Sequence, residues 1–297
     1  MVAETDLAYM SIRELESRRD RWHADVRGPT QLPEPALVLN LDSRRKSDIR
    51  TMKHVHQMCI LHRENFWTSN QIKQLYLVDA FLTLSKAENP LGLYAIARSI
   101  LELSALLHEV RERLVETTLR LTEQNWRQVG ETFFGLITRA RFATTHPTLR
   151  DALAQGGFPS GRLKPFNITH CVTNLAAHQD HRDAATRYEA LCDFVHHNLG
   201  SSTTANSGTG VADAARSSGG GVVFGNSPVT ITQYEYPARG KTARALNELA
   251  PDFLRDALAC VQWLNLIPDG PFPPELLEAV TGSRFGFEVL REPRSST

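Results

Sequence analysis

The residues best suited to chemistry lie in two apolar segments, 94–110 and 187–198. In the first, Arg98 and Glu102 are four residues apart and therefore share one helix face. In the second, Tyr188 begins an apolar ridge that ends at His196. A guanidinium held by a carboxylate can grip a phosphate or stabilise a developing anion, and an imidazole can move protons near neutral pH. Together these groups would suit metal-independent cleavage of a phosphodiester through an internal hydroxyl.

The same residues have a structural interpretation. Apolar side chains surround Arg98 and Glu102 on nearly every side, so we expect an internal helix with Arg98 largely buried beside Glu102. The two residues would then form an ion pair that ties helices together, with His196 as a core or capping residue. Both interpretations stay open on the sequence alone.

A second candidate is the pair Arg141 and His146 in the segment RFATTH. The Arg-x4-His spacing resembles the minimal motif of HEPN-type ribonucleases, all-helical proteins common in bacterial toxin and defence systems. Phe142 follows the arginine here, where that family usually has a polar residue. The alternative is a chance spacing, with His146 favoured by the dipole at the end of a helix.

The segments ARSILE, residues 97–102, and YEALCDFVHHN, residues 188–198, together resemble a widespread family of uncharacterised bacterial helical proteins. Its members carry an Arg-Ser-x-x-Glu helix and a later Tyr-x-x-Leu-x-x-x-Val-His-Pro segment. The resemblance covers residues 45–200 and implies an α-helical bundle in which Arg98, Glu102, Tyr188 and His196 come together. His197 stands where the family usually has proline, so the geometry after His196 is expected to differ.

Metal and cofactor sites are not expected. Histidines and cysteines cluster at 170–197, but without the HExxH or CxxC spacings of zinc sites. The chain also lacks the glycine-rich phosphate loop, the dinucleotide fingerprint and the nucleophile elbow. Any chemistry would therefore rest on the side chains themselves.

Charge and composition limit the partners. The 33 basic residues balance the 33 acidic ones, so a polyanion site would have to be local. Four scattered cysteines suit reduced thiols, and we expect a cytoplasmic protein with no export signal and no membrane insertion. The expected partners are RNA or another protein. The sequence is also compatible with a homo-oligomer.

Helix periodicity prevails along the chain, and the predicted class is all-α, a multi-helix bundle with one short β-hairpin. The hairpin would pair 222–224 with 229–236 across a turn at 225–228. The predicted helices are 6–27, 44–64, 70–87, 90–121, 123–145, 170–178, 182–198, 241–249, 252–266 and 273–280.

The predicted domain organisation begins with an N-terminal helical arm, 1–35, and a helical bundle core, 36–200. A Gly- and Ser-rich flexible loop, 201–221, follows, because it lacks large apolar side chains. The hairpin and C-terminal helices, 222–285, would complete the bundle before a tail, 286–297. Two functions follow from this sequence: a ribonuclease of toxin or phage-defence type, or a non-catalytic helical interaction or sensor module whose loop orders on a partner.

Overall fold

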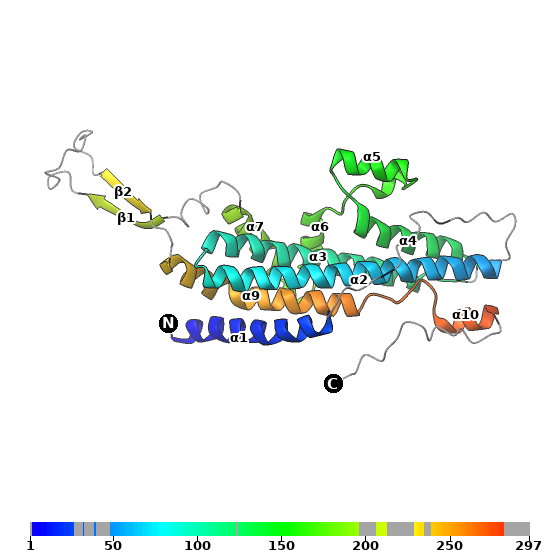
Figure 1. The fold of residues 1–297 in the computed structure, drawn as a ribbon, viewed down its shortest axis with the longest axis horizontal. Coiled ribbons are helices and arrows are strands. Elements are labelled where there is room, and N and C mark those ends of the chain that lie inside the picture. The colour runs from blue at the N-terminus through cyan, green and yellow to red at the C-terminus, as the bar shows by residue number, and fades with distance from the viewer. Residues whose placement is uncertain are drawn as a thin grey trace. The chain divides into compact units, whose positions relative to one another are not determined.

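The computed structural model describes residues 2–26, 32, 39, 48–122, 124–195, 206–212, 229–234 and 239–281. Helices dominate these residues, and the predicted all-α class is confirmed (Figure 1). The chain divides into two compact units. Unit 1 consists of Met1–Thr30, Asn70–Glu109 and Asn167–Asn265, and unit 2 consists of Gln31–Ser69, Val110–Phe166 and Leu266–Thr297.

Helices α2 and α3 contribute residues to both units, and each other element belongs to one of them. The helices are α1 (Val2–Asp25), α2 (Asp48–Lys86), α3 (Pro90–Leu119), α4 (Trp126–Phe142), α5 (Pro147–Gln155), α6 (Ile168–Leu175), α7 (Ala184–Val195), α9 (Arg239–Asn265) and α10 (Pro274–Thr281). Short 3-10 helices cover Ser160–Arg162 and Gln179–His181. Most of these elements match the predicted ones within a few residues.

The predicted break between 64 and 70 is absent, because α2 runs without interruption through this polar stretch. Asn65 donates its side-chain amide to the carbonyl of Leu61, and the Ser69 hydroxyl donates to the carbonyl of Phe66. Polar side chains that would favour a turn elsewhere are bonded here to the helix's own backbone.

Pro251 likewise does not divide the last long helix into two, since α9 continues through it. Proline has no N–H group, so the carbonyl of Asn247 loses its helical donor. Ala250 and Phe253, on either side of the proline, are buried in unit 1. Packing on both sides therefore holds α9 together across a residue that normally ends a helix.

The predicted hairpin is not seen, and 222–224 lies outside the described residues. Strand β2 (Val229–Tyr234) instead pairs antiparallel with β1 (Asn206–Ala212), from Ala212 opposite Val229 to Asn206 opposite Tyr234, with an irregularity after Asn206. Strand β1 falls inside the segment predicted as a flexible loop, 201–221. The prediction of flexibility stays untested for the remainder of that segment.

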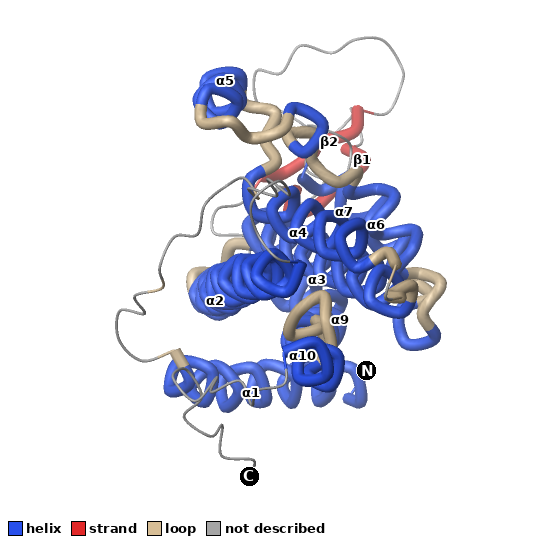
Figure 2. The backbone as a smooth tube through the Cα atoms, turned by 90° about the vertical axis from the view of Figure 1, so that its right-hand side faces the viewer, coloured by secondary structure: helices blue, strands red, loops and turns tan. Residues whose placement is uncertain are grey.

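In unit 1, α1 packs across α9 at an angle (Figures 1 and 2). The buried residues of α1 include Ala8, Ser11, Leu15 and Trp22, whose spacing of three, four and seven residues forms one stripe. Across α2 and α9, the rings of Phe81 and Phe253 stack with centroids 3.9 Å apart. The side chain of Gln74 donates to the carbonyl of Ala257 at 2.9 Å, which satisfies a buried amide.

In unit 2, α4 approaches α2 closely at Gly130. A Cβ atom added to this glycine would lie 2.5 Å from Cγ1 of Val55, so a side chain there would separate the helices. The thiol of Cys59 points at the carbonyl of Gly130, with sulfur and oxygen 3.7 Å apart. Burial raises the pKa of the Cys59 thiol far above its ordinary value, which keeps the thiol protonated.

Helix α3 is long and apolar enough to cross a bilayer by length and composition alone. The core helix of a folded domain passes the same test, and 56% of the most apolar window of α3 is buried in the structure. Packing inside the protein therefore explains the apolar character of that buried part of α3.

The Phe81 and Phe253 stack leads to a prediction. Phe253→Ala should destabilise unit 1 by about 3–5 kcal/mol, because both rings are fully buried and the cavity cannot collapse completely. Tyr76→Ala on the exposed face of α2 is the control and should change the unfolding temperature little. Thermal unfolding followed by circular dichroism measures both, and equal effects of the two variants would contradict this account of the core.

A second prediction concerns His56 in unit 2, whose ring stacks on Phe272 with centroids 5.8 Å apart. Burial lowers the pKa of His56 to about 4, against the opposing charge of Asp269. Because the unfolded chain binds this proton near pH 6.5, acidification from about pH 6.5 to 4 should cost up to about 3 kcal/mol.

The measurement is urea unfolding of wild type, His56→Phe and His54→Gln at pH 7 and pH 4.5. His56→Phe should lose part of the stability difference between the two pH values, whereas His54→Gln removes an exposed imidazole from the same helix and should retain it. An identical pH dependence in all three proteins would show that His56 does not carry the effect.

Candidate functional site

Helices α3 and α7 bring Arg98, Glu102 and Tyr188 together within unit 1. Nε of Arg98 donates to Oε1 of Glu102 at 2.8 Å, and a terminal nitrogen of Arg98 donates to the hydroxyl of Tyr188 at 3.3 Å. The guanidinium carbon lies 5.3 Å from the centre of the Tyr188 ring. A carboxylate and a phenol from two helices thus orient one permanent positive charge.

This cluster is half-buried, which corrects the expectation that Arg98 is largely buried. The side chain of Arg98 is 19% exposed and that of Glu102 is 30% exposed. Surface ion pairs contribute little to stability, and a pair with this exposure lies between a surface pair and a core pair. The charge of Arg98 remains within reach of solvent and of a bound anion.

The cluster's protonation suits anion binding. Burial alone lowers the pKa of Arg98, but the bonds to Glu102 and Tyr188 outweigh it and leave the pKa raised. Burial also raises the pKa of Tyr188, reinforced by the charge of Glu102 and opposed by Arg98. Tyr188 is therefore a neutral phenol at physiological pH, able to donate a hydrogen bond.

A second layer of contacts fixes the same two helices nearby. The rings of Tyr94 on α3 and Phe194 on α7 stack with centroids 3.8 Å apart. The Tyr94 hydroxyl donates to Oε2 of Glu248 on α9 at 2.8 Å, and burial is the main cause of its raised pKa. These contacts hold the end of α7, next to which His196 follows in sequence.

His196 lies outside the described residues, directly after Val195, the last residue of α7. Its assignment as the proton-transfer group stays a prediction. Of the four residues expected to meet, the structure brings Arg98, Glu102 and Tyr188 together.

The alternative pair, Arg141 and His146, sits on two elements of unit 2. Helix α4 ends at Phe142, and His146 is the exposed N-cap of α5, a helix that the sequence did not predict. Arg141 and the fully buried ring of His62 meet instead, with a terminal nitrogen 2.7 Å from Nδ1 of His62. The two residues of the Arg-x4-His motif therefore do not share a helix, although their proposed role remains untested.

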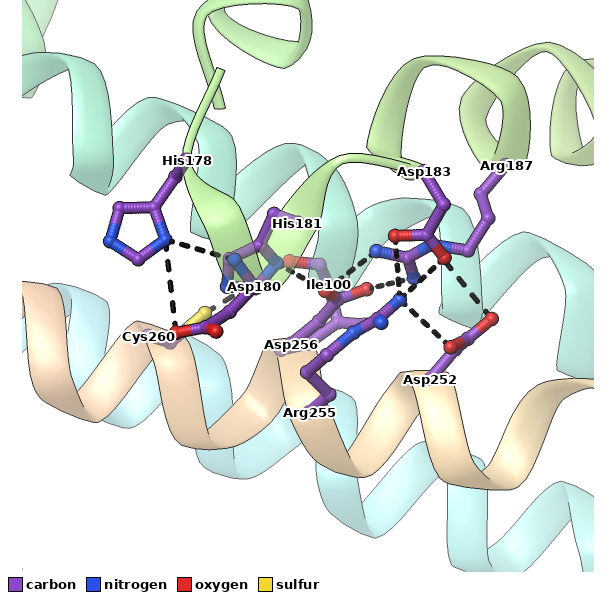
Figure 3. Close-up of polar contacts among 10 residues, drawn as sticks. All are labelled: Ile100, His178, Asp180, His181, Asp183, Arg187, Asp252, Arg255, Asp256 and Cys260. Carbon is purple, nitrogen blue, oxygen red and sulfur yellow. Dashed lines mark hydrogen bonds and ion pairs between the residues drawn. The ribbon is translucent and has the colours of Figure 1, made fainter. Parts of the chain in front are cut away.

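A buried ion-pair network on α7 and α9 was not anticipated from the sequence (Figure 3). Arg187 grips Asp256 with two bonds, from its terminal nitrogens to the carboxylate oxygens at 2.8 and 3.1 Å. Their side chains are 13% and 2% exposed. A nearly inaccessible carboxylate needs such a bidentate partner, because removing the partner would leave a buried charge unpaired.

Further charges extend this network toward solvent. Asp183 lies 3.1 Å from Nε of Arg187, and Arg255 contacts both Asp183 and Asp252 at 2.8 Å. Burial tends to raise the pKa of Asp183, but the bond and charges of Arg255 and Arg187 leave it lowered. Burial dominates at Asp252 and raises its pKa. The pKa values of Asp183 and Asp252 are thus shifted in opposite directions.

Imidazoles border the network along Trp263. Nδ1 of His181 lies 3.6 Å from Oδ1 of Asp256, and the rings of His108, His178 and His181 lie 5.0, 5.3 and 6.2 Å from the Trp263 ring. No three metal-ligating side chains among the described residues form a group that could hold an ion. The three imidazoles therefore pack on the Trp263 ring, next to the charged network.

Sequence spacing contained part of the signal for this network. Asp183 and Arg187 are four residues apart, and Asp252, Arg255 and Asp256 recur at helical spacing. What the spacing could not show is that the two faces meet.

Comparisons of the chain with family models, with curated proteins and with solved structures found no match.

The two arginine pairs should differ in their effect on stability. Asp256→Ala should cost about 3 kcal/mol, because Arg187 loses its bidentate partner and keeps only Asp183 and Asp252. Glu102→Ala, at a more exposed pair, should cost about 1 kcal/mol or less. The double variant Arg187→Met with Asp256→Leu should recover much of the loss, since it removes both charges. Thermal melts of the three proteins decide this, and a Glu102→Ala loss as large as that of Asp256→Ala would refute the ranking.

Proposed function

We propose that this protein is a metal-independent ribonuclease of toxin or phage-defence type that acts at Arg98, Glu102 and Tyr188. The observation that supports the proposal is the double restraint on Arg98, whose guanidinium is bonded to a carboxylate and a phenol yet is 19% exposed. A fixed, partly solvated positive charge is suited to stabilising charge that develops on a phosphate.

In the proposed reaction, the ribose 2′-oxygen attacks the neighbouring phosphorus and its proton passes to a base. The bond from phosphorus to the 5′-oxygen breaks, and that oxygen takes up a proton. The products are a 2′,3′-cyclic phosphate and a 5′-hydroxyl, so the step needs no added reactant. Arg98 would stabilise the phosphorane oxygens, and the Tyr188 phenol would donate a hydrogen bond to one of them.

His196 is the proposed proton-transfer group, because an imidazole exchanges a proton near neutral pH and a guanidinium does not. In sequence it follows directly after the last residue of α7, and Tyr188 lies near the start of the same helix. The stack of Tyr94 on Phe194 would fix the helix end next to which His196 follows.

A second candidate function is a non-catalytic interaction module. It is favoured by the outer face of α1, where Leu7, Tyr9 and Met10 are 54%, 59% and 66% exposed. Apolar side chains gathered on an exposed helix are typical of protein interaction sites. If the protein binds a partner through α1, Arg98 would have a structural role, joining α3 to α7 through Tyr188.

The test of the ribonuclease is cleavage of mixed RNA substrates by the purified protein in the presence of chelator. Arg98→Ala and His196→Ala should each reduce the rate by ~10² or more, the scale of losing a transition-state donor or a general base. Tyr188→Phe keeps the ring and should cause a smaller loss.

Arg18→Ala is the matched control, because Arg18 forms the same Nε to Oε1 bond with a glutamate four residues away, Glu14, on an exposed part of α1 in unit 1. It should cleave as wild type does. Loss of cleavage in His146→Ala with activity retained in His196→Ala would move the site to Arg141 and His146. No cleavage of any RNA by the wild-type protein would reject the proposal in favour of the interaction module.

A further inference from the structure

Positive charge is concentrated in one part of a chain whose total charge is zero. Residues 139–166 contain five basic side chains, Arg139, Arg141, Arg150, Arg162 and Lys164, and one acidic side chain, Asp151, a net charge of +4. The net charge of the whole chain is zero. A local excess of this kind is the electrostatic footprint that polyanion binding requires.

The fold of unit 2 gathers several of these charges around an aromatic ring. Nε of Arg139 donates to the carbonyl of Lys164 at 2.8 Å, and a terminal nitrogen donates to that of Pro165 at 3.1 Å, so the loop is held on α4. The guanidinium of Arg139 lies 4.2 Å from the centre of the Phe166 ring, and that of Arg113, from α3, lies 5.6 Å from it. Two guanidinium groups from different helices therefore meet at one ring.

Arg162 lies across α4 on the same side. A Cβ atom added to Gly135 would be 3.1 Å from Nε of Arg162, and Gly135 is one helical turn before Arg139. Burial lowers the pKa of Arg162, against the opposing charge of Glu131. The Arg162 guanidinium also lies 5.4 Å from the centre of the Phe134 ring. A phosphate close to this partly buried charge would stabilise it further.

These groups are accessible. Lys164 is exposed, and Arg113, Arg139, Arg162 and Phe166 are half-buried. We call Arg113, Arg139, Arg162, Lys164 and Phe166 the Arg–Phe surface. It combines permanent positive charge with a ring partly open to solvent.

We propose that the Arg–Phe surface binds single-stranded RNA, with its basic groups along the phosphates and Phe166 against a base. Single-stranded nucleic acid is recognised by this combination, because charge follows the backbone and every base offers a face for stacking. An acidic protein would use the charges but would have no need of the ring. The inference goes beyond the proposed cleavage and does not depend on it.

The test uses the full chain and a fluorescein-labelled 2′-O-methyl oligouridine of roughly 12 nucleotides, within the usual site sizes for single strands. This probe has no 2′-hydroxyl to attack, so binding is measured separately from cleavage. Fluorescence anisotropy should give a dissociation constant that rises steeply with salt concentration. Lys164→Gln and Arg162→Gln should each weaken binding and reduce the salt slope by about 0.7.

The remaining variants separate charge from stacking. Arg162→Lys keeps the charge and should preserve the slope, and Phe166→Leu should weaken binding roughly tenfold with the slope unchanged. Arg120→Gln is the matched control, since it removes an exposed arginine of unit 2 that is already paired with Glu116. Thermal melts check that each variant is folded. If Phe166→Leu destabilises unit 2, Lys164→Gln still tests the proposal, because Lys164 is exposed and its replacement should not affect folding.

Salt-insensitive or undetectable binding by the wild type would overturn the proposal, as would wild-type affinity in Lys164→Gln and Arg162→Gln. Competition by polyglutamate as effective as that by unlabelled RNA, with no effect of Phe166→Leu, would assign the surface to an acidic protein and also reject RNA. Binding of this probe by a wild-type protein that cleaves no unmodified RNA would reject the ribonuclease alone.

Discussion

The buried bond between Arg187 and Asp256 is the constraint on which the candidate site depends. It fixes α7 on α9 through two hydrogen bonds at a carboxylate that is 2% exposed. The next residue of α7 is Tyr188, whose hydroxyl contacts Arg98 on α3. Consecutive residues of one short helix therefore contact two different helices. A shift of α7 on α9 would move the phenol away from the guanidinium it orients.

The two arginine pairs of unit 1 differ in burial, and this difference suits one to stabilising the fold and the other to binding a ligand. Arg187 and Asp256 lie where water cannot compensate a lost partner, so neither can be exchanged alone without a large penalty. Arg98 and Glu102 lie where water still reaches, so their pairing contributes little to folding. The half-buried pair is the one free to interact with a ligand, and the buried pair is the one that holds its surroundings.

Contacts within one helix could be predicted from the sequence, whereas contacts between distant segments could not. Arg98 and Glu102 share a face because helical spacing requires it, and the all-α class followed from periodicity along the chain. Arg187 and Asp256 are 69 residues apart, and nothing in either segment specifies the other as its partner. Tyr188 was placed beside Arg98 by a family resemblance and not by spacing.

The errors along the chain have a similar origin. Asn65 and Ser69 have side chains typical of turns, yet they bond to the carbonyls of their own helix, so the break predicted there does not occur. Strand β2 was anticipated at 229–236, but its partner comes from a Gly- and Ser-rich stretch that carries little pairing signal. Propensity described each segment in isolation, and tertiary contacts decided between its options.

Pro251 gives α9 a joint whose direction must be set from outside. With the carbonyl of Asn247 released from the backbone ladder, the two halves of the helix are coupled less stiffly there than elsewhere. Asp252, Arg255 and Asp256 begin immediately beyond this joint and are anchored to Asp183 and Arg187. The ion pairs consequently hold α9 just beyond the point where its own backbone ladder is interrupted, so charge as well as packing fixes the direction of the helix there.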